Sequence, residues 1–124
     1  MKICITSQGN TLESQVDPRF GRCAYFIIVD PDTIDFEAID NVSAGSAGGA
    51  GIQSGQLISE KDVKVVLTGN VGPNAFQTLN AAKIEIITGV NGTIKDVITK
   101  YKNGELKSIS EPTVGSHFGM KGGS

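Results

Sequence analysis

Two arginines and a cysteine lie within five residues of each other, where a polar loop runs into an apolar strand. The segment VDPRFGRCAYFIIVD contains Arg19, Arg22 and Cys23. A guanidinium keeps its positive charge and can form paired hydrogen bonds to an anion. In a net-acidic chain, this pair predicts an anionic ligand or an internal partner such as Asp17. An ordinary solvated surface pair is the alternative.

Cys23 adds a potential metal ligand to the two arginines. Nearby positive charge favours a thiolate, and a thiolate binds iron well. The alternative is a small buried hydrophobic residue, which is our interpretation of Cys4 in the middle of KICIT. His117 is the single histidine, and we expect it to be inert in the loose segment GSHFGM.

A second stretch suited to anions is TGNVGPNAF, residues 68–76. The chain turns at Gly69 and Gly72, and Pro73 predicts the first position of a helix. Backbone N–H groups at a helix N-terminus favour an anion, although many such turns bind nothing. GAGIQSG, residues 49–55, is one residue away from a dinucleotide fingerprint but does not follow the first strand of a βαβ unit. The alternative there is a loop entering a tightly packed helix.

Several enzyme classes lack the residues they require. The predicted strands KICITS and VKVVLTG carry no carboxylate, which argues against a metal-dependent nuclease. We find no Ser-His-Asp set, no paired carboxylates and no metal-spaced Cys/His cluster in the sequence. The residues alone indicate a binding protein rather than an enzyme.

Length and composition narrow the class further. The chain has 124 residues, a formal net charge of −2 and a pI of about 5.3. This size fits one domain, which we assign to residues 1–112, with a flexible glycine-rich tail at residues 113–124. The acidic balance argues against a nucleic-acid or membrane-surface binder, and no apolar run approaches the roughly 20 residues of a membrane span. We expect a cytoplasmic protein with both cysteines reduced.

Hydrophobic periodicity predicts five strands and three helices. The strands are expected at residues 2–7, 24–30, 34–41, 63–69 and 84–89, and the helices at residues 47–60, 73–82 and 93–102. The second and third strands form a hairpin whose third strand is exposed. Right-handed crossovers then give a mixed sheet of order 3-2-1-4-5, in a ribonuclease-H-like arrangement flanked by three helices.

This topology places a switch point between the first and fourth strands. Ligands of open α/β sheets tend to bind beyond the carboxyl ends of the strands at such a point. The loops SQGNTLESQVDPRFGRC and TGNVGPNAF both begin there, so the sequence predicts one site built from both loops.

The motifs RFGRCAYF, GAGIQSGQLI and VVLTGNVGPNAF, in that order, resemble the dinitrogenase iron–molybdenum cofactor biosynthesis family, which includes NifX, NafY and the C-terminal domain of NifB. The resemblance runs from residue 2 to about residue 106. It implies a ribonuclease-H-like fold and non-covalent, non-catalytic carriage of an anionic iron–sulfur cluster or iron–molybdenum cofactor precursor.

The resemblance also implies roles for individual residues. Arg19 and Arg22 would offset the charge of the cluster, and Cys23 or His117 would ligate an iron. The remaining expected contacts are Phe20, Gly21, Gly69, Asn70, Gly72 and Asn74. The implied partners are iron–sulfur or metallo-cofactor assembly proteins, and we expect a monomer or weak dimer. The alternatives are an interaction or regulatory module that binds no cluster, and an enzyme of phosphate-containing metabolites that uses the GNVGP turn.

Overall fold

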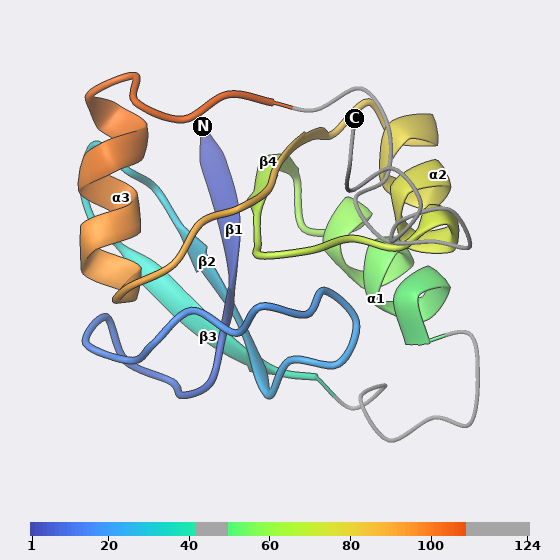
Figure 1. The fold of residues 1–124 in the computed structure, drawn as a ribbon, viewed down its shortest axis with the longest axis horizontal. Helices are drawn as coiled ribbons and strands as arrows, with labels where there is room; N and C mark the ends of the chain where they lie inside the picture. Colours follow the sequence, from blue (N-terminus) through green and yellow to red (C-terminus); the bar gives the residue numbers. More distant parts are fainter. Residues whose placement is uncertain (42–49, 109–124) are drawn as a thin grey trace, which may run out of the picture.

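The protein is an α/β structure with one sheet and three helices (Figure 1). The computed structural model describes residues 1–41 and 50–108. The strands are β1 (Lys2–Ser7), β2 (Tyr25–Val29), β3 (Phe36–Asp40), β4 (Val63–Leu67) and β5 (Glu85–Ile87). The helices are α1 (Ala50–Ser59), α2 (Pro73–Ala81) and α3 (Ile94–Lys102). The predicted sequence of elements is confirmed, with boundaries that differ by a few residues.

The predicted strand order is also confirmed. The sheet has the order β3-β2-β1-β4-β5. β1 pairs antiparallel with β2 and parallel with β4, β2 pairs antiparallel with β3, and β4 pairs parallel with β5. β1 and β4 therefore end at the same edge of the sheet, as the proposed switch point requires.

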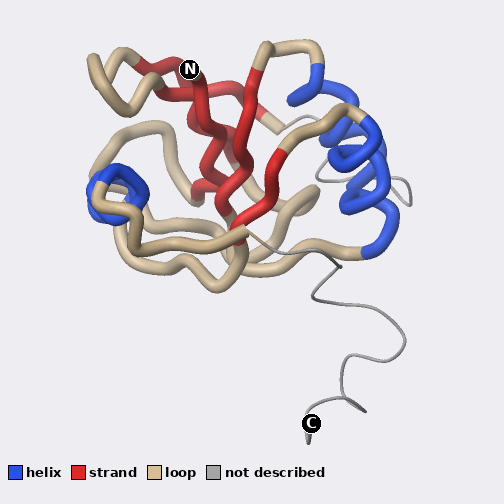
Figure 2. Tube along the Cα trace, turned by 90° about the horizontal axis from the view of Figure 1, so that it is seen from above, coloured by secondary structure: helices blue, strands red, loops and turns tan. Residues whose placement is uncertain are grey.

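Alternating side chains give the sheet two buried faces. In β1, Ile3 and Ile5 belong to the core under α3, whereas Cys4 belongs to the core under α1 and α2. Figure 2 shows α3 on one side of the sheet and the other two helices on the opposite side. Helices on both faces explain why the central strands read as continuous apolar runs.

Capping residues set the starts of two helices. Thr93 caps α3 by accepting a hydrogen bond from the Asp96 N–H at 3.1 Å. Pro73 is the first residue of α2, where its missing N–H costs no intrahelical bond. Leu79 of α2 is fully buried and Phe76 packs partly buried against the same core, so this face of the helix covers the sheet.

The glycines inside α1 allow close packing against α2. A Cβ at Gly51 would lie 3.1 Å from the Ala75 Cβ, and one at Gly55 would lie 2.8 Å from the Thr78 Cγ2. The neighbour of these glycines is therefore the second helix. This packing explains the two glycines without a bound dinucleotide. Residues 42–49, where the GAGIQSG motif begins, lie outside the described residues.

Candidate functional site

The loop after β1 and the loop after β4 are hydrogen-bonded to each other at the carboxyl edge of the sheet. The Asn70 N–H donates to the Pro18 carbonyl at 2.7 Å, and the Phe20 N–H donates to the Asn70 carbonyl at 3.1 Å. These bonds form an isolated parallel bridge between Arg19 and Asn70. We call residues 17–20 and 68–70 the loop junction. Figure 1 shows the first of these loops running along the lower edge of the sheet.

Gly69 is required by this close approach. A Cβ at position 69 would lie 2.6 Å from the Pro18 Cα and 2.7 Å from the Pro18 carbonyl oxygen. Real Cβ atoms do not approach backbone atoms so closely, so any larger residue would separate the two loops.

Buried polar groups fasten the loop junction to the ends of the strands. The Asp17 N–H donates to the Thr6 carbonyl at 2.9 Å, and the Thr6 hydroxyl donates to the Asp17 carbonyl at 2.7 Å. The Thr6 and Thr68 hydroxyl oxygens are 2.8 Å apart and hydrogen-bonded. All three residues are buried. These buried hydroxyl and backbone groups therefore satisfy one another, which helps to fix the geometry of the junction.

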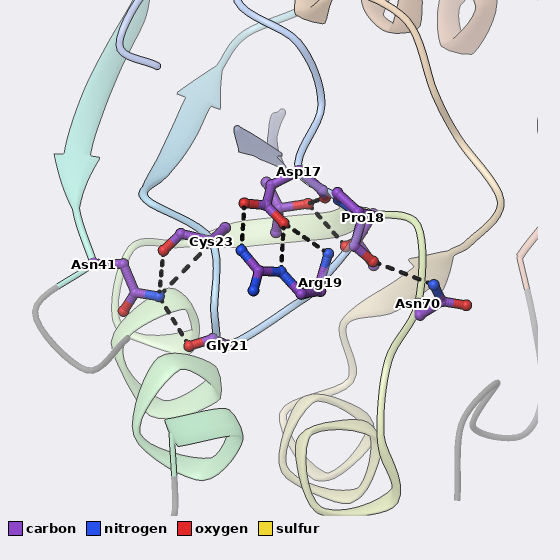
Figure 3. Close-up of polar contacts among 9 residues, drawn as sticks. Asp17, Pro18, Arg19, Gly21, Cys23, Asn41 and Asn70 are labelled. Carbon is purple, nitrogen blue, oxygen red and sulfur yellow. Dashed lines mark hydrogen bonds and ion pairs between the residues drawn. The ribbon is translucent and has the colours of Figure 1, made fainter. Parts of the chain in front are cut away.

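Arg19 is held by the carboxylate of Asp17 (Figure 3). The Arg19 Nε lies 3.2 Å from Asp17 Oδ1, the Nη2 lies 3.3 Å from Oδ2, and the Arg19 backbone N–H also donates to Oδ1 at 3.0 Å. The carboxylate side chain is 4% exposed and the arginine side chain 63% exposed. The hydrogen bond and charge of Asp17 raise the pKa of Arg19. Since a guanidinium has five N–H groups, three of them stay available for another anion.

Gly21 separates a buried residue from an exposed cation. Phe20 is 7% exposed and its ring centroid lies 5.6 Å from that of Phe26 in the core. Gly21 has a φ of 94°, a conformation that few other residues adopt easily. After this turn Arg22 is exposed. Arg19 and Arg22 are the two arginines of the chain, and both are exposed beside the same junction.

The side chain of Cys23 is part of the core, although its backbone belongs to the loop before β2. It is fully buried, and burial together with the charge of Asp17 raises the pKa of its thiol to about 12. The expectation that the arginines favour its thiolate is therefore wrong, because desolvation outweighs the distant cations. Hydrogen bonds from Asn41 and from backbone groups of Gly21 and Ser7 lower the pKa but do not reverse the shift.

Asn41 anchors the turn that precedes β2, and sequence reasoning missed it. Its Nδ2 donates to the Gly21 carbonyl at 3.0 Å and to the Cys23 carbonyl at 2.9 Å (Figure 3). The Ser54 hydroxyl in α1 donates to the Asn41 Oδ1 at 3.3 Å. Asn41 therefore ties the RFGRC turn to the end of β3 and to α1.

The second loop continues from the junction into α2. Gly72 is the N-cap residue, and within the described residues no side chain caps this end of the helix. Gly72 and Asn70 are partly exposed, and Asn74 is exposed in the first turn. Of the predicted contact residues, Arg19, Phe20, Gly69 and Asn70 belong to the loop junction itself. The others follow it within a few positions along the chain, and Phe20, Gly21 and Cys23 are buried.

Metal-ligating side chains are not grouped in the parts of the chain that the structure describes. Residues 1–41 and 50–108 hold no set of three His, Cys, Asp or Glu side chains suited to a metal ion. His117 lies outside the described residues. None of the helices in the described ranges has the length and apolar character needed to cross a bilayer.

The profile of the dinitrogenase iron–molybdenum cofactor family matches residues 1–104. The chain belongs to this family. The apo form of the orange protein from Desulfovibrio gigas is 37% identical, with a TM-score of 0.87 over 90% of this chain and 94% of that one. The NifB-like protein of Thermotoga is 34% identical, with a TM-score of 0.76 over 86% and 91% of the two chains.

A further relative is similar to this chain over most of its length. An uncharacterised protein of Methanocaldococcus jannaschii is 28% identical over 112 residues, which is 88% of this chain and 92% of the relative. Family membership, expected from the RFGRC and GNVGP motifs, is confirmed by the profile match.

Proposed function

We propose that this member of the dinitrogenase iron–molybdenum cofactor family is a non-catalytic carrier of an anionic metal–sulfur cluster, bound at the loop junction. The cargo would be an iron–sulfur cluster or a precursor of the iron–molybdenum cofactor. One observation carries the proposal: both arginines of the chain are exposed beside a rigid junction at the switch point of the sheet. Family membership supports the choice of cargo.

The two arginines would supply positive charge without covalent attachment. Asp17 uses two of the five N–H groups of Arg19, so the remaining three can donate to cluster sulfides. Arg22 adds a second cation three residues along. Charge-assisted hydrogen bonds of this kind are stronger than neutral ones and suit a cargo that must later be released.

The second loop would supply backbone donors from the first turn of α2, since the Asn70 N–H already donates to the Pro18 carbonyl. Gly69, Asn70 and Gly72 bring the chain to the first turn of α2, where the helix dipole favours negative charge. We propose that Asn70, Gly72 and Asn74 contact the cargo from this side. Phe20 and Gly21 would act indirectly, since their burial fixes the turn that exposes Arg22.

The similarity to the orange protein supports a bound group in this fold. Its structure is described as the apo form, and the term denotes a protein without the group that it binds. We extend this to the present chain as part of the proposal. Ligation of iron by Cys23 or His117 stays a prediction, and for Cys23 it would require the buried thiol to become exposed and lose its proton.

We also propose the finer features that the resemblance implied. These are a ribonuclease-H-like classification of the sheet, one domain at residues 1–112 with a tail at residues 113–124, and a cytoplasmic location. The proposed partners are iron–sulfur or metallo-cofactor assembly proteins, and the proposed state is a monomer or weak dimer. The strand order supports the first of these.

An interaction or regulatory module without cargo is the second candidate. The charge of Arg19 is already balanced by Asp17, which favours a structural role for this arginine. In that case the family fold would be kept, and the wild-type protein would take up no cluster.

An anaerobic titration with a synthetic iron–sulfur cluster anion separates the two candidates. Co-elution of iron with protein in gel filtration, with the visible absorption of the cluster, is expected for wild type. The Arg19→Gln/Arg22→Gln protein should bind at least tenfold more weakly. The Lys100→Gln/Lys102→Gln protein removes the same charge from the exposed end of α3 and should bind like wild type. Equal uptake by all three proteins, or none by wild type, contradicts the carrier proposal.

A further inference from the structure

β3 is an edge strand whose side chains are mostly exposed. Among the described residues it pairs only with β2, and four of its five residues are exposed, with Ile39 half-buried. An edge strand presents backbone N–H and C=O groups that can pair with an added strand. The outer edge of β3 therefore has backbone groups that can pair with a further strand.

Two large apolar side chains are exposed at the start of this strand. Phe36 is 42% exposed and Ile34 is 38% exposed. Phe36 pairs with Val29, whose side chain lies in the core under α3, so Phe36 is on the same face of the sheet. Neither Phe36 nor Ile34 belongs to either core cluster of the described residues. The helix that covers this face of the central strands does not bury the side chain of Phe36.

Ile34 also has an unusual backbone conformation. Its φ is 64°, in the left-handed region where β-branched residues are rare. Glycine or asparagine would adopt this conformation at lower conformational cost. Strained residues with exposed side chains are often kept for a function rather than for stability.

The charge around the strand is uniformly negative. Asp32, Asp35, Glu37 and Asp40 are exposed, and the sequence contains no Lys or Arg between residues 24 and 60. Two copies of this edge would repel each other, because like charges opposite one another destabilise a strand pair. A segment that carries cations would be attracted instead.

We infer that the β3 edge, residues 34–40, is a docking surface for a partner protein that adds an extended segment of alternating basic and apolar residues. The apolar residues would cover Phe36 and Ile34, the basic residues would face the carboxylates, and the backbone would pair with β3. β3 ends next to Asn41, which anchors the RFGRC turn. A partner docked there would lie beside the loop junction.

A synthetic peptide that alternates lysine and valine is the probe for this surface. Added to ¹⁵N-labelled protein, it should shift the amide signals of residues 34–40 and slow hydrogen exchange at the outer edge of β3. A peptide that alternates glutamate and valine should not bind. A lysine–valine peptide N-methylated at every residue should bind at least tenfold more weakly, because neither of its edges can then donate to the strand ladder.

Two single variants separate docking from folding. Ile34→Asn relieves the left-handed strain, so its melting temperature should equal or exceed that of wild type while peptide affinity falls at least fivefold. Glu37→Lys should weaken binding at least tenfold at low salt. Glu60→Lys makes the same charge change just beyond α1 and should change affinity by less than twofold.

Any of the following results would overturn the docking surface. These are equal binding of the acidic and basic peptides, peptide-induced shifts that avoid residues 34–40, and unchanged affinity in the Ile34→Asn and Glu37→Lys proteins. Concentration-dependent self-association that shifts β3 signals without any peptide would also overturn it, since the occupant would then be a second copy. Cluster uptake does not enter this experiment, so the carrier proposal stands or falls separately.

Discussion

The loop junction and the β3 edge differ in how they are built and in their charge. The junction joins residues some 50 positions apart in the sequence, and buried hydrogen bonds from Thr6, Thr68 and Asp17 fix it. β3 is held on one side by β2 through a short turn, and its side chains are exposed. The junction exposes two arginines, whereas the β3 edge exposes only carboxylates among its charged groups.

Because of this difference, the two regions of the protein suit different ligands. A rigid positive site suits a compact anionic cargo, because preformed donors need no reordering when the cargo binds. An open acidic edge suits an extended basic segment, which brings its own backbone hydrogen-bonding groups. Four sets of substitutions test how differently parts of the molecule are held, from the largest expected effect to the smallest.

Two phenylalanines in neighbouring strands give the largest contrast. Phe26 of β2 is fully buried, whereas Phe36 of β3 is 42% exposed. We expect Phe26→Ala to lower the free energy of unfolding by about 4 kcal/mol, because it leaves a cavity. Phe36→Ala should lower it by less than about 1 kcal/mol. Urea unfolding followed by circular dichroism measures both, and similar losses would show that β3 is held as firmly as β2.

Two glycine-to-alanine substitutions test the packing of the loop junction. Gly69→Ala should cost about 3 kcal/mol of unfolding free energy, because the new Cβ meets the Pro18 backbone. Gly104→Ala is the control: Gly104 has a φ of 73° and open space around it, so the cost should be about 1 kcal/mol from backbone strain alone. Equal costs, measured by thermal and urea unfolding, would argue against the close approach of the two loops.

The buried thiol of Cys23 should make stability depend on alkaline pH. Its pKa is about 12 in the folded protein against a reference of 9.0, so only the unfolded chain ionises between these values. The unfolded state then binds fewer protons, and stability should fall with rising pH across this window. Cys23 should lower the free energy of unfolding by at most about 1.4 kcal/mol per pH unit in this window.

Cys23→Ala should remove this contribution and make the profile above pH 9 less steep, while buried Cys4, whose pKa is also raised by burial, keeps part of the slope. Unfolding free energies at several pH values between 8 and 11 give the two slopes. Parallel slopes for wild type and variant would mean that Cys23 is accessible and ionises in the folded state.

The pair formed by Arg19 and Asp17 should give the smallest effect. A double-mutant cycle with Arg19→Ala and Asp17→Asn should yield a coupling energy of about 1 kcal/mol, because one partner is largely exposed to solvent. Urea unfolding of the four proteins provides the cycle. A coupling near zero would mean that the carboxylate does not orient this guanidinium.

Local patterns were sufficient to predict the elements and their order. The apolar spacing of Ile94, Val97 and Ile98 correctly predicted α3. Alternation in IDFEAID correctly predicted an exposed third strand. Both signals arise within about ten residues, and right-handed crossover rules then leave few possible strand orders.

Contacts between residues far apart in the sequence could not be predicted from local patterns. The burial of Cys23 depends on how the RFGRC turn meets β1 and Asn41, and no local pattern encodes it. The fit of Gly69 against Pro18 likewise needs the folded backbone. One signal was available and unused: Thr6 and Thr68 are polar residues near the ends of two adjacent apolar strands, which indicates buried hydrogen bonds at that edge.

The central claim, a cargo site at the loop junction separate from the β3 edge, is tested most directly by mapping cluster binding residue by residue. Under anaerobic conditions, a synthetic iron–sulfur cluster anion is titrated into ¹⁵N-labelled protein and amide signals are followed. The account predicts that signals of residues 19–23 and 69–74 shift or broaden while those of residues 36–40 stay unchanged. Changes confined to β3 or α3, or no change anywhere, would contradict it.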